Sequence, residues 1–172
     1  MKRAILATIL ASVLCLSACA IPAWVNTAES IAEVGVPIAA SLVDVIDPAL
    51  APAATLIEDG FSALVKTLDT YKASPTATNL QAVQAAFNAV DTNVAQLESA
   101  AQIKNPATDT TVTKVVNLLS QAVTEIGALV PPPAAAAMGV VAPQRQAKGW
   151  KAKDFKKQFN RIVKGDARFK EL

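Results

Sequence analysis

Apolar residues recur at heptad spacing along the middle of the chain. From Leu50 to Tyr71 they follow alternating steps of four and three, and charged residues such as Glu58 and Lys66 fall outside the series. This spacing places the apolar side chains on one face of an α-helix. Two later segments repeat it, and the three series are Leu50, Ala54, Ile57, Phe61, Leu64, Leu68 and Tyr71, then Leu80, Val83, Phe87, Val90, Val94, Leu97 and Ala101, then Val112, Val116, Leu119, Val123, Ile126 and Val130. The sequence predicts three regular amphipathic helices.

A fourth segment, residues 22–46, is less regular. Apolar positions from Trp24 to Val45 keep the same spacing, but Gly35 and Pro37 interrupt the series. Proline inside a helix removes a hydrogen bond and clashes with the preceding turn, at a cost of about 3 kcal/mol. We therefore expect a kinked helix, or two shorter helices, in this segment.

The segments between the apolar series are short and contain proline. In each of them the proline follows a residue that can cap a helix, and the three pairs are Asp47-Pro48, Ser74-Pro75 and Asn105-Pro106. Connections this short join antiparallel helices. Residues 19–130 are therefore predicted to form an all-α, antiparallel up-down helical bundle of three regular helices and one Pro-kinked N-terminal helix.

The pattern changes after Val130. Residues 131–147 begin with three prolines and continue as a predicted Pro/Ala-rich linker. Apolar periodicity returns in residues 148–172, where one helical face carries Trp150, Phe155, Phe159, Ile162 and Val163. Basic residues occupy mainly the other faces of this segment, and Gly165 is expected to end the helix. The tail is predicted to be a separate, basic, amphipathic C-terminal helix.

Charge divides the chain into an acidic and a basic part. Residues 19–144 contain four basic and eleven acidic side chains, a net charge of −7, whereas residues 145–172 carry +7. Such asymmetry indicates an electrostatic interaction. Anionic lipid, the cell wall, a protein partner and the chain's own bundle are all compatible with the tail, and nucleic acid is disfavoured for an exported protein. The candidate membrane or partner contacts are Trp150, Lys151, Lys153, Phe155, Lys156, Lys157, Phe159 and Arg161.

The N-terminal residues have the pattern of a secretory signal peptide. Lys2 and Arg3 precede an apolar run over residues 4–14, and small residues follow it. The sequence Leu16-Ser17-Ala18-Cys19 resembles the lipobox of bacterial lipoproteins. By that resemblance, residues 1–18 are removed, the thiol of Cys19 receives a diacylglyceryl group, and the new N-terminus is acylated.

The resemblance also implies a location. In enterobacterial-type sorting, Asp after the lipidated cysteine retains a lipoprotein in the inner membrane, so Ala20 implies the outer membrane, facing the periplasm. Two or three acyl chains anchor a protein stably, and no transmembrane helix is needed. The alternative interpretations are an ordinary signal peptide that contains a cysteine, or an uncleaved anchor.

Histidine is absent from the whole chain. Its absence excludes a Ser-His-Asp triad, a Cys-His pair and His-containing zinc or di-iron sites. Ser62 and Lys66 stand four residues apart, but no Gly-rich loop that could stabilise an oxyanion lies nearby. The carboxylates beside the apolar series are expected to be solvated, and they are Glu58, Asp59, Asp91, Glu98 and Glu125. The sequence predicts no catalytic residue, no metal site and no cofactor.

These features predict a non-enzymatic cell-envelope protein, anchored to a membrane through lipidated Cys19. Its role would be that of a scaffold or contact module, with the basic tail reaching a second surface or partner. These features are also compatible with an oligomer. Two alternatives remain open at this point. One is a lysis or exclusion lipoprotein of phage or bacteriocin type, and the other is a carrier of apolar small molecules inside the bundle.

Overall fold

The computed structural model describes residues 21–104, 110–131 and 147–172. Within these ranges the chain forms helices and no strand, and the helices are α2 (Ala23–Val43), α3 (Ala51–Ala73), α4 (Ala77–Lys104), α5 (Thr110–Leu129) and α6 (Ala152–Val163). The predicted all-α fold class is confirmed. Cys19, the predicted signal peptide and most of the predicted linker lie outside the described residues.

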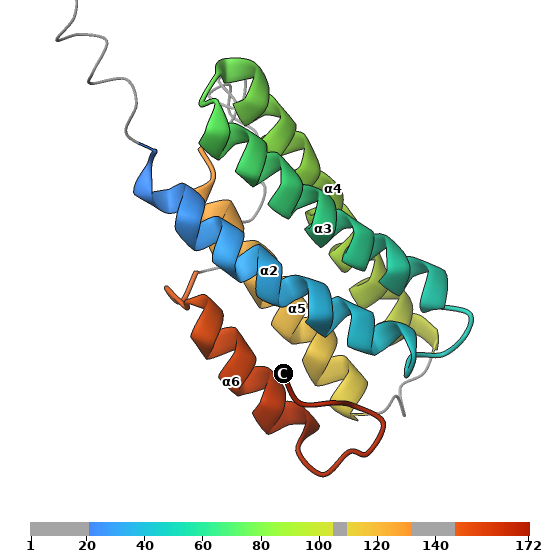
Figure 1. Ribbon diagram of the computed structural model, residues 1–172. Coiled ribbons are helices and arrows are strands. Elements are labelled where there is room, and N and C mark those ends of the chain that lie inside the picture. Colours follow the sequence, from blue (N-terminus) through green and yellow to red (C-terminus); the bar gives the residue numbers. More distant parts are fainter. Residues whose placement is uncertain (1–20, 105–109, 132–146) are drawn as a thin grey trace, which may run out of the picture.

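Helices α2 to α5 form a closed up-down bundle (Figure 1). α2 packs against α3 and α5, and α4 packs against the same two helices, so each helix of the ring has two neighbours. Successive helices run in opposite directions, as the short connections predict. The shared core lies along the axis of this ring.

The core is built from the predicted apolar series. Every member of the series in α5 is buried, and so is every member in and before α3 from Leu50 to Leu68. Tyr71, the last member of that series, is half-buried. In α4 the buried members are Val83, Val90, Val94 and Leu97. Burial of such side chains contributes roughly 1.5–3 kcal/mol each, which makes these series the main source of the bundle's stability.

Two glycines let neighbouring helices approach closely. A Cβ atom added to Gly35 would lie 2.6 Å from Cδ1 and Cε1 of Phe61, whose ring is fully buried. A Cβ atom at Gly127 would lie 2.7 Å from Cζ of Phe87. Carbon atoms in contact sit about 3.5–4.0 Å apart, so these rings fill the space that a side chain would need. Gly35, which interrupts the series in the sequence, is a packing position.

α2 is one continuous helix that includes Pro37. The alternative of two shorter helices is therefore wrong. Proline at this position removes the hydrogen bond that the carbonyl of Glu33 would accept, but Glu33 is exposed, so water can take that place. Ile31 and Ile38 lie on either side of the missing hydrogen bond and are buried. Their packing offsets part of the free-energy cost of the proline.

The start of α4 differs from the sequence-based expectation by two residues. Ser74 ends α3 as its C-terminal cap, and α4 begins at Ala77. Thr76 Oγ1 accepts a hydrogen bond from the backbone N–H of Asn79 at 3.2 Å, which is the contact of an N-cap. Thr76 therefore has the role that the sequence assigned to Ser74.

The N-terminal end of α2 is fixed to the C-terminal end of α3. Trp24 stacks on Tyr71, with ring centroids 5.7 Å apart. Lys72 Nζ lies 2.5 Å from Oε2 of Glu29, a buried residue. The hydrogen bond to Glu29 raises the pKa of Lys72. These contacts secure the end of the bundle that follows the predicted anchor.

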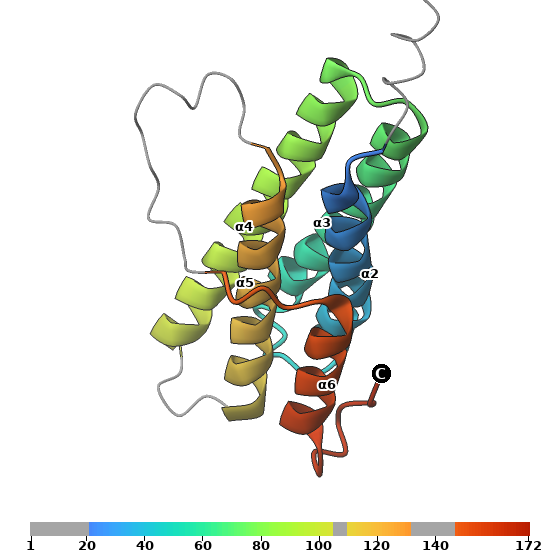
Figure 2. The same cartoon turned by 90° about the vertical axis from the view of Figure 1, so that its left-hand side faces the viewer.

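The predicted C-terminal helix is present, and it packs on the bundle. α6 lies against α2 and α5, on the side away from α3 and α4 (Figure 2). It runs in the same direction as α2 and lies toward the end of α2 that is remote from the N-terminus. Its buried face and the turn after it add Phe155, Phe159, Val163 and Phe169 to the same core as the bundle.

Candidate functional site: the C-terminal helix and its basic face

The chain before α6 is held by a carboxylate of α5. The backbone N–H of Gly149 donates a hydrogen bond to Oε2 of Glu125 at 2.8 Å, and the N–H of Lys148 donates to Oε1. Gln121 Nε2 donates to Oε1 as well, at 2.8 Å. Gly149 has a φ of +71°, a conformation that favours glycine. Glu125 therefore fixes the point at which the tail joins the bundle.

Glu125 is buried, so the prediction that this carboxylate is solvated is wrong. The reason is that the tail covers a second face of α5. A signal for this is present in the sequence, because a second series at steps of three and four includes Val115, Leu118 and Ala122, all buried, and then Glu125. A helix with two apolar series needs a partner on each. The prediction of a solvated carboxylate used only the first series.

The far end of α6 is held by a second group of polar contacts. Asp166 accepts hydrogen bonds from Nε of Arg168 at 2.9 Å and from Nη2 at 2.6 Å. These bonds, supported by a hydrogen bond from Thr111 of α5, lower the pKa of Asp166 to about 2. Asn160 of α6 donates to the carbonyl of Leu172 at 3.0 Å and accepts from its N–H at 2.8 Å. The C-terminus is thereby folded back onto α6.

The aromatic residues that were predicted as contacts face the bundle. Phe155 and Phe159 are fully buried, and Trp150 is half-buried. The ring of Trp150 meets that of Phe155 edge to face at 5.3 Å, and Nζ of Lys148 lies 5.0 Å from the Trp150 ring centroid. These rings pack on the chain's own bundle, which is one of the interactions that the sequence allowed for the tail.

The predicted cations remain on the surface. Lys151, Lys153, Lys156, Lys157 and Arg161 are all exposed. The backbone N–H of Lys151 donates to Oδ2 of Asp154 at 2.9 Å, which caps the start of α6. The tail therefore docks through apolar burial and through the polar contacts at its two ends, and these five cations stay in solvent.

Four of the exposed cations follow one line along α6. They are Lys153, Lys157 and Arg161, which lie four residues apart on one face of α6, and Lys164, the C-terminal cap three residues further on. This set is called the basic face below. None of the four forms an ion pair with a carboxylate in the described ranges. The basic face is thus an unneutralised positive surface on a folded body.

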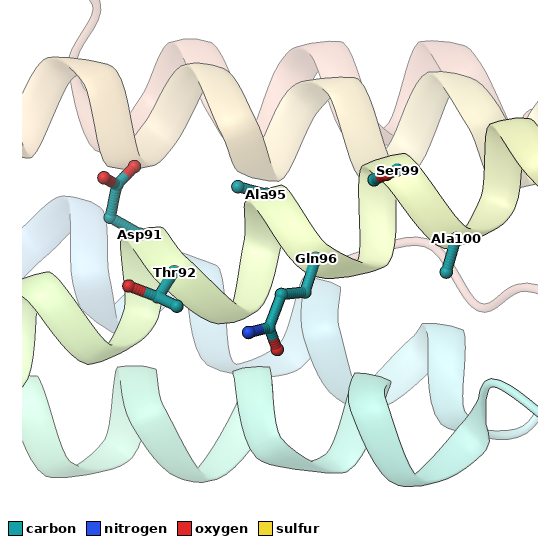
Figure 3. Close-up of a pocket in the computed structure, with 6 residues that line it drawn as sticks. All are labelled: Asp91, Thr92, Ala95, Gln96, Ser99 and Ala100. Atoms are coloured by element: carbon teal, nitrogen blue, oxygen red, sulfur yellow. The ribbon is translucent and has the colours of Figure 1, made fainter. Parts of the chain in front are cut away.

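A shallow hollow on α4 is a weaker candidate (Figure 3). Among the described residues its lining comes from α4 alone and consists of Asp91, Thr92, Ala95, Gln96, Ser99 and Ala100. Specific small-molecule sites bring polar groups together from several elements. Since no second helix contributes a group to the described lining, this hollow has no convergent chemistry.

The described residues offer no group of side chains suited to bind a metal ion. Ser62 and Lys66 are both exposed on the outer side of α3. No helix in the described ranges combines the length and the apolar composition that a membrane span requires. In the comparisons with known proteins, no protein family, curated protein or solved structure matches the chain.

Proposed function

We propose that this protein is a lipid-anchored, non-enzymatic contact module of the cell envelope. In this proposal the acylated Cys19 holds one end of the bundle in a membrane. The resemblance of Ala20 to a sorting signal supports the outer membrane. The helical bundle acts as a spacer, and the basic face of α6 binds a second, anionic surface.

The observation that carries the proposal is that the cations of the basic face are exposed on a helix that is fixed to the bundle. Burial of Phe155 and Phe159 fixes the helix on the bundle, and the four cations opposite point away from it. Each Lys or Arg near an anionic membrane surface is worth about 1 kcal/mol. Four such charges on a rigid helix, with no carboxylate partner among the described residues, suffice for reversible binding.

The position of α6 supports contact with a second surface. Cys19 precedes Ala23, the first residue of α2, by four residues, which span at most about 14 Å. An anchored Cys19 would therefore keep the start of α2 close to its membrane. α6 lies toward the other end of α2, so the helix that carries the basic face is displaced from the anchor point along the bundle.

Vesicle bridging tests this proposal directly. A chain that starts at Cys19 has this residue as its only thiol, because Cys15 belongs to the predicted signal peptide. The thiol can be coupled to a maleimide lipid in neutral vesicles, and clustering with anionic vesicles can be followed by light scattering. We expect clustering at low salt and its loss in 1 M salt, where the Debye length falls to about 3 Å.

Two variants distinguish an effect of the basic face on clustering from an effect of the protein's net charge. Lys157→Gln should weaken clustering about fivefold, since one surface charge is worth about 1 kcal/mol. Lys66→Gln removes the same charge from α3, a helix that does not pack on α6, and should have a smaller effect. Equal effects of the two variants, or no clustering by the parent chain, would refute the proposal.

A further inference from the structure

A groove with a volume of about 460 Å³ lies between α5 and α6. Its lining comes from both helices and from the segment before α6, and its size is in the range of small-molecule sites. The contacts that hold the two helices together lie near its ends, at Glu125 on one side and between Asp166 and Thr111 on the other. The groove lies between these two groups of contacts.

The groove is positively charged. Lys114 of α5 and Lys148 before α6 both line it. Neither lysine pairs with a carboxylate in the part of the chain that the structure describes. Arg161 adds a third charge at the edge, because its Nη1 donates a hydrogen bond to Oε1 of the lining residue Gln158 at 3.2 Å. Glu125, the nearby carboxylate, is already occupied by the three N–H groups described above. The groove therefore favours an anion.

Two side-chain amides are oriented by their neighbours. Gln121 donates its Nε2 to Glu125, so its Oε1 remains to accept a hydrogen bond from a ligand. Gln158 accepts from Arg161, so its Nε2 remains to donate. With the amide of Asn117, which also lines it, the groove thus offers both donors and acceptors, which suits a ligand with both an anionic group and a hydroxyl group.

The rest of the lining is apolar. Leu118 and Ile162 contribute aliphatic surface, and the half-buried Trp150 contributes an aromatic edge. Such a surface suits the C–H groups of a short polyol. Phosphate oxygens are strong acceptors of charge-assisted hydrogen bonds, and two ammonium groups and an amide supply the donors for them.

We propose that the groove between α5 and α6 binds a hydroxylated phosphate ester such as glycerol phosphate. The ester is either free or the headgroup of phosphatidylglycerol. Apart from Arg161 at its edge, this site uses side chains outside the basic face, and it does not depend on the proposed bridging of two membranes.

Trp150 is a built-in reporter of this site. The chain contains two tryptophans, so Trp24→Phe leaves Trp150 as the only one. In this background we expect glycerol 3-phosphate to change Trp150 emission with saturation, whereas glycerol should not. Lys114→Gln should weaken binding about tenfold, the effect of losing one charge-assisted hydrogen bond. Lys114 is exposed, so this change removes no packing.

Controls distinguish the groove from general charge attraction. Lys66→Gln and Lys157→Gln remove one charge each outside the groove and should leave glycerol phosphate binding unchanged. Equal weakening by Lys114→Gln and Lys66→Gln would overturn the proposal. If Lys157→Gln impairs vesicle clustering but not glycerol phosphate binding, the two proposed sites are separate.

Vesicles identify the source of the ester. Phosphatidylglycerol vesicles are compared with phosphatidic acid vesicles, which present a phosphate without the glycerol headgroup. An emission change that depends on Lys114 and on phosphatidylglycerol, without a response to glycerol phosphate, assigns a lipid headgroup. A response to both assigns the ester itself, and a response to neither overturns the proposal.

Discussion

Gly35 and Glu125 are single residues whose surroundings decide their roles. Both look ordinary in the sequence, one as a break in an apolar series and the other as a carboxylate beside one. In the structure the first lies under the Phe61 ring and the second binds the backbone of the tail. Neither role follows from local spacing, because each depends on a residue from another helix.

Gly35→Ala is expected to destabilise the protein by about 1 kcal/mol. Overpacking against Phe61 costs about 1–3 kcal/mol, and alanine returns about 0.5–1 kcal/mol of helix propensity. Gly60→Ala is the matched control, because the closest atom to its Cβ would be the Cγ2 methyl of Val90, at 3.0 Å. Urea denaturation measures both, and a Gly35→Ala variant as stable as Gly60→Ala would show that the close packing is not as described.

Glu125→Ala should lower the free energy of unfolding by about 1–2 kcal/mol. The substitution leaves the N–H groups of Lys148 and Gly149 without their acceptor. Glu33→Ala removes an exposed carboxylate of α2 and should change stability by no more than about 0.5 kcal/mol. The account of the tail junction would be wrong if the two variants were equally stable in urea.

Asp166 predicts a dependence of stability on acid pH. Hydrogen bonds from Arg168 hold the pKa of Asp166 at about 2, below the usual 3.8, so the charged form stabilises the folded state. This contribution is complete above about pH 4 and is lost as the pH falls through about 2. The parent should therefore lose stability between pH 4 and pH 2 more steeply than Asp166→Asn. Parallel curves for the two proteins would argue against this contact.

At the scale of elements, the four bundle helices were predictable and the placement of α6 was not. Heptad series and short connections are local properties, and they specify α2 to α5 as an antiparallel bundle. The position of α6 depends on apolar surface left on α2 and α5, which appears in the sequence only as a second series such as Val115, Leu118 and Ala122. The basic face was predictable as a set of cations, but not as the outer side of a docked helix.

Phe159→Ala tests the docking of α6. The side chain is fully buried, and its loss should cost about 3–5 kcal/mol at the interface. Weaker docking exposes the backbone of α6 to a protease, so the sensitive measurement is trypsin cleavage after Lys156 and Lys157, which should accelerate. Ile162→Ala, at a half-buried position, should accelerate cleavage less. Equal cleavage of the parent and Phe159→Ala would mean that this ring does not hold the helix.

At the scale of the whole molecule, the positively charged residues and the proposed lipid anchor lie at different places. The acidic bundle follows the predicted lipid site, and the basic residues extend along a helix on its side. Because the aromatic face of that helix is buried, the electrostatic interaction we propose needs no insertion of rings into lipid. This arrangement fits a spacer with one covalent and one reversible attachment.

Cys19→Ser should abolish the covalent attachment. The resemblance to a lipobox rests on four residues, and the diacylglyceryl group that it implies is attached to the thiol of Cys19. In cells, labelling with a fatty-acid analogue should be lost and the protein should leave the membrane fraction or stay unprocessed. Labelling that persists in the variant would exclude Cys19 as the acceptor.

Hydrogen exchange of α6 is the most direct test of the central claim, that the tail is a docked helix that binds through its exposed cations. It is measured on a chain starting at Ala20, alone and with anionic vesicles. We predict that the amides of Phe155 and Phe159 exchange slowly in both samples, since the helix stays folded on α2 and α5. Rapid exchange in the free chain, or a loss of protection when vesicles bind, would contradict the account.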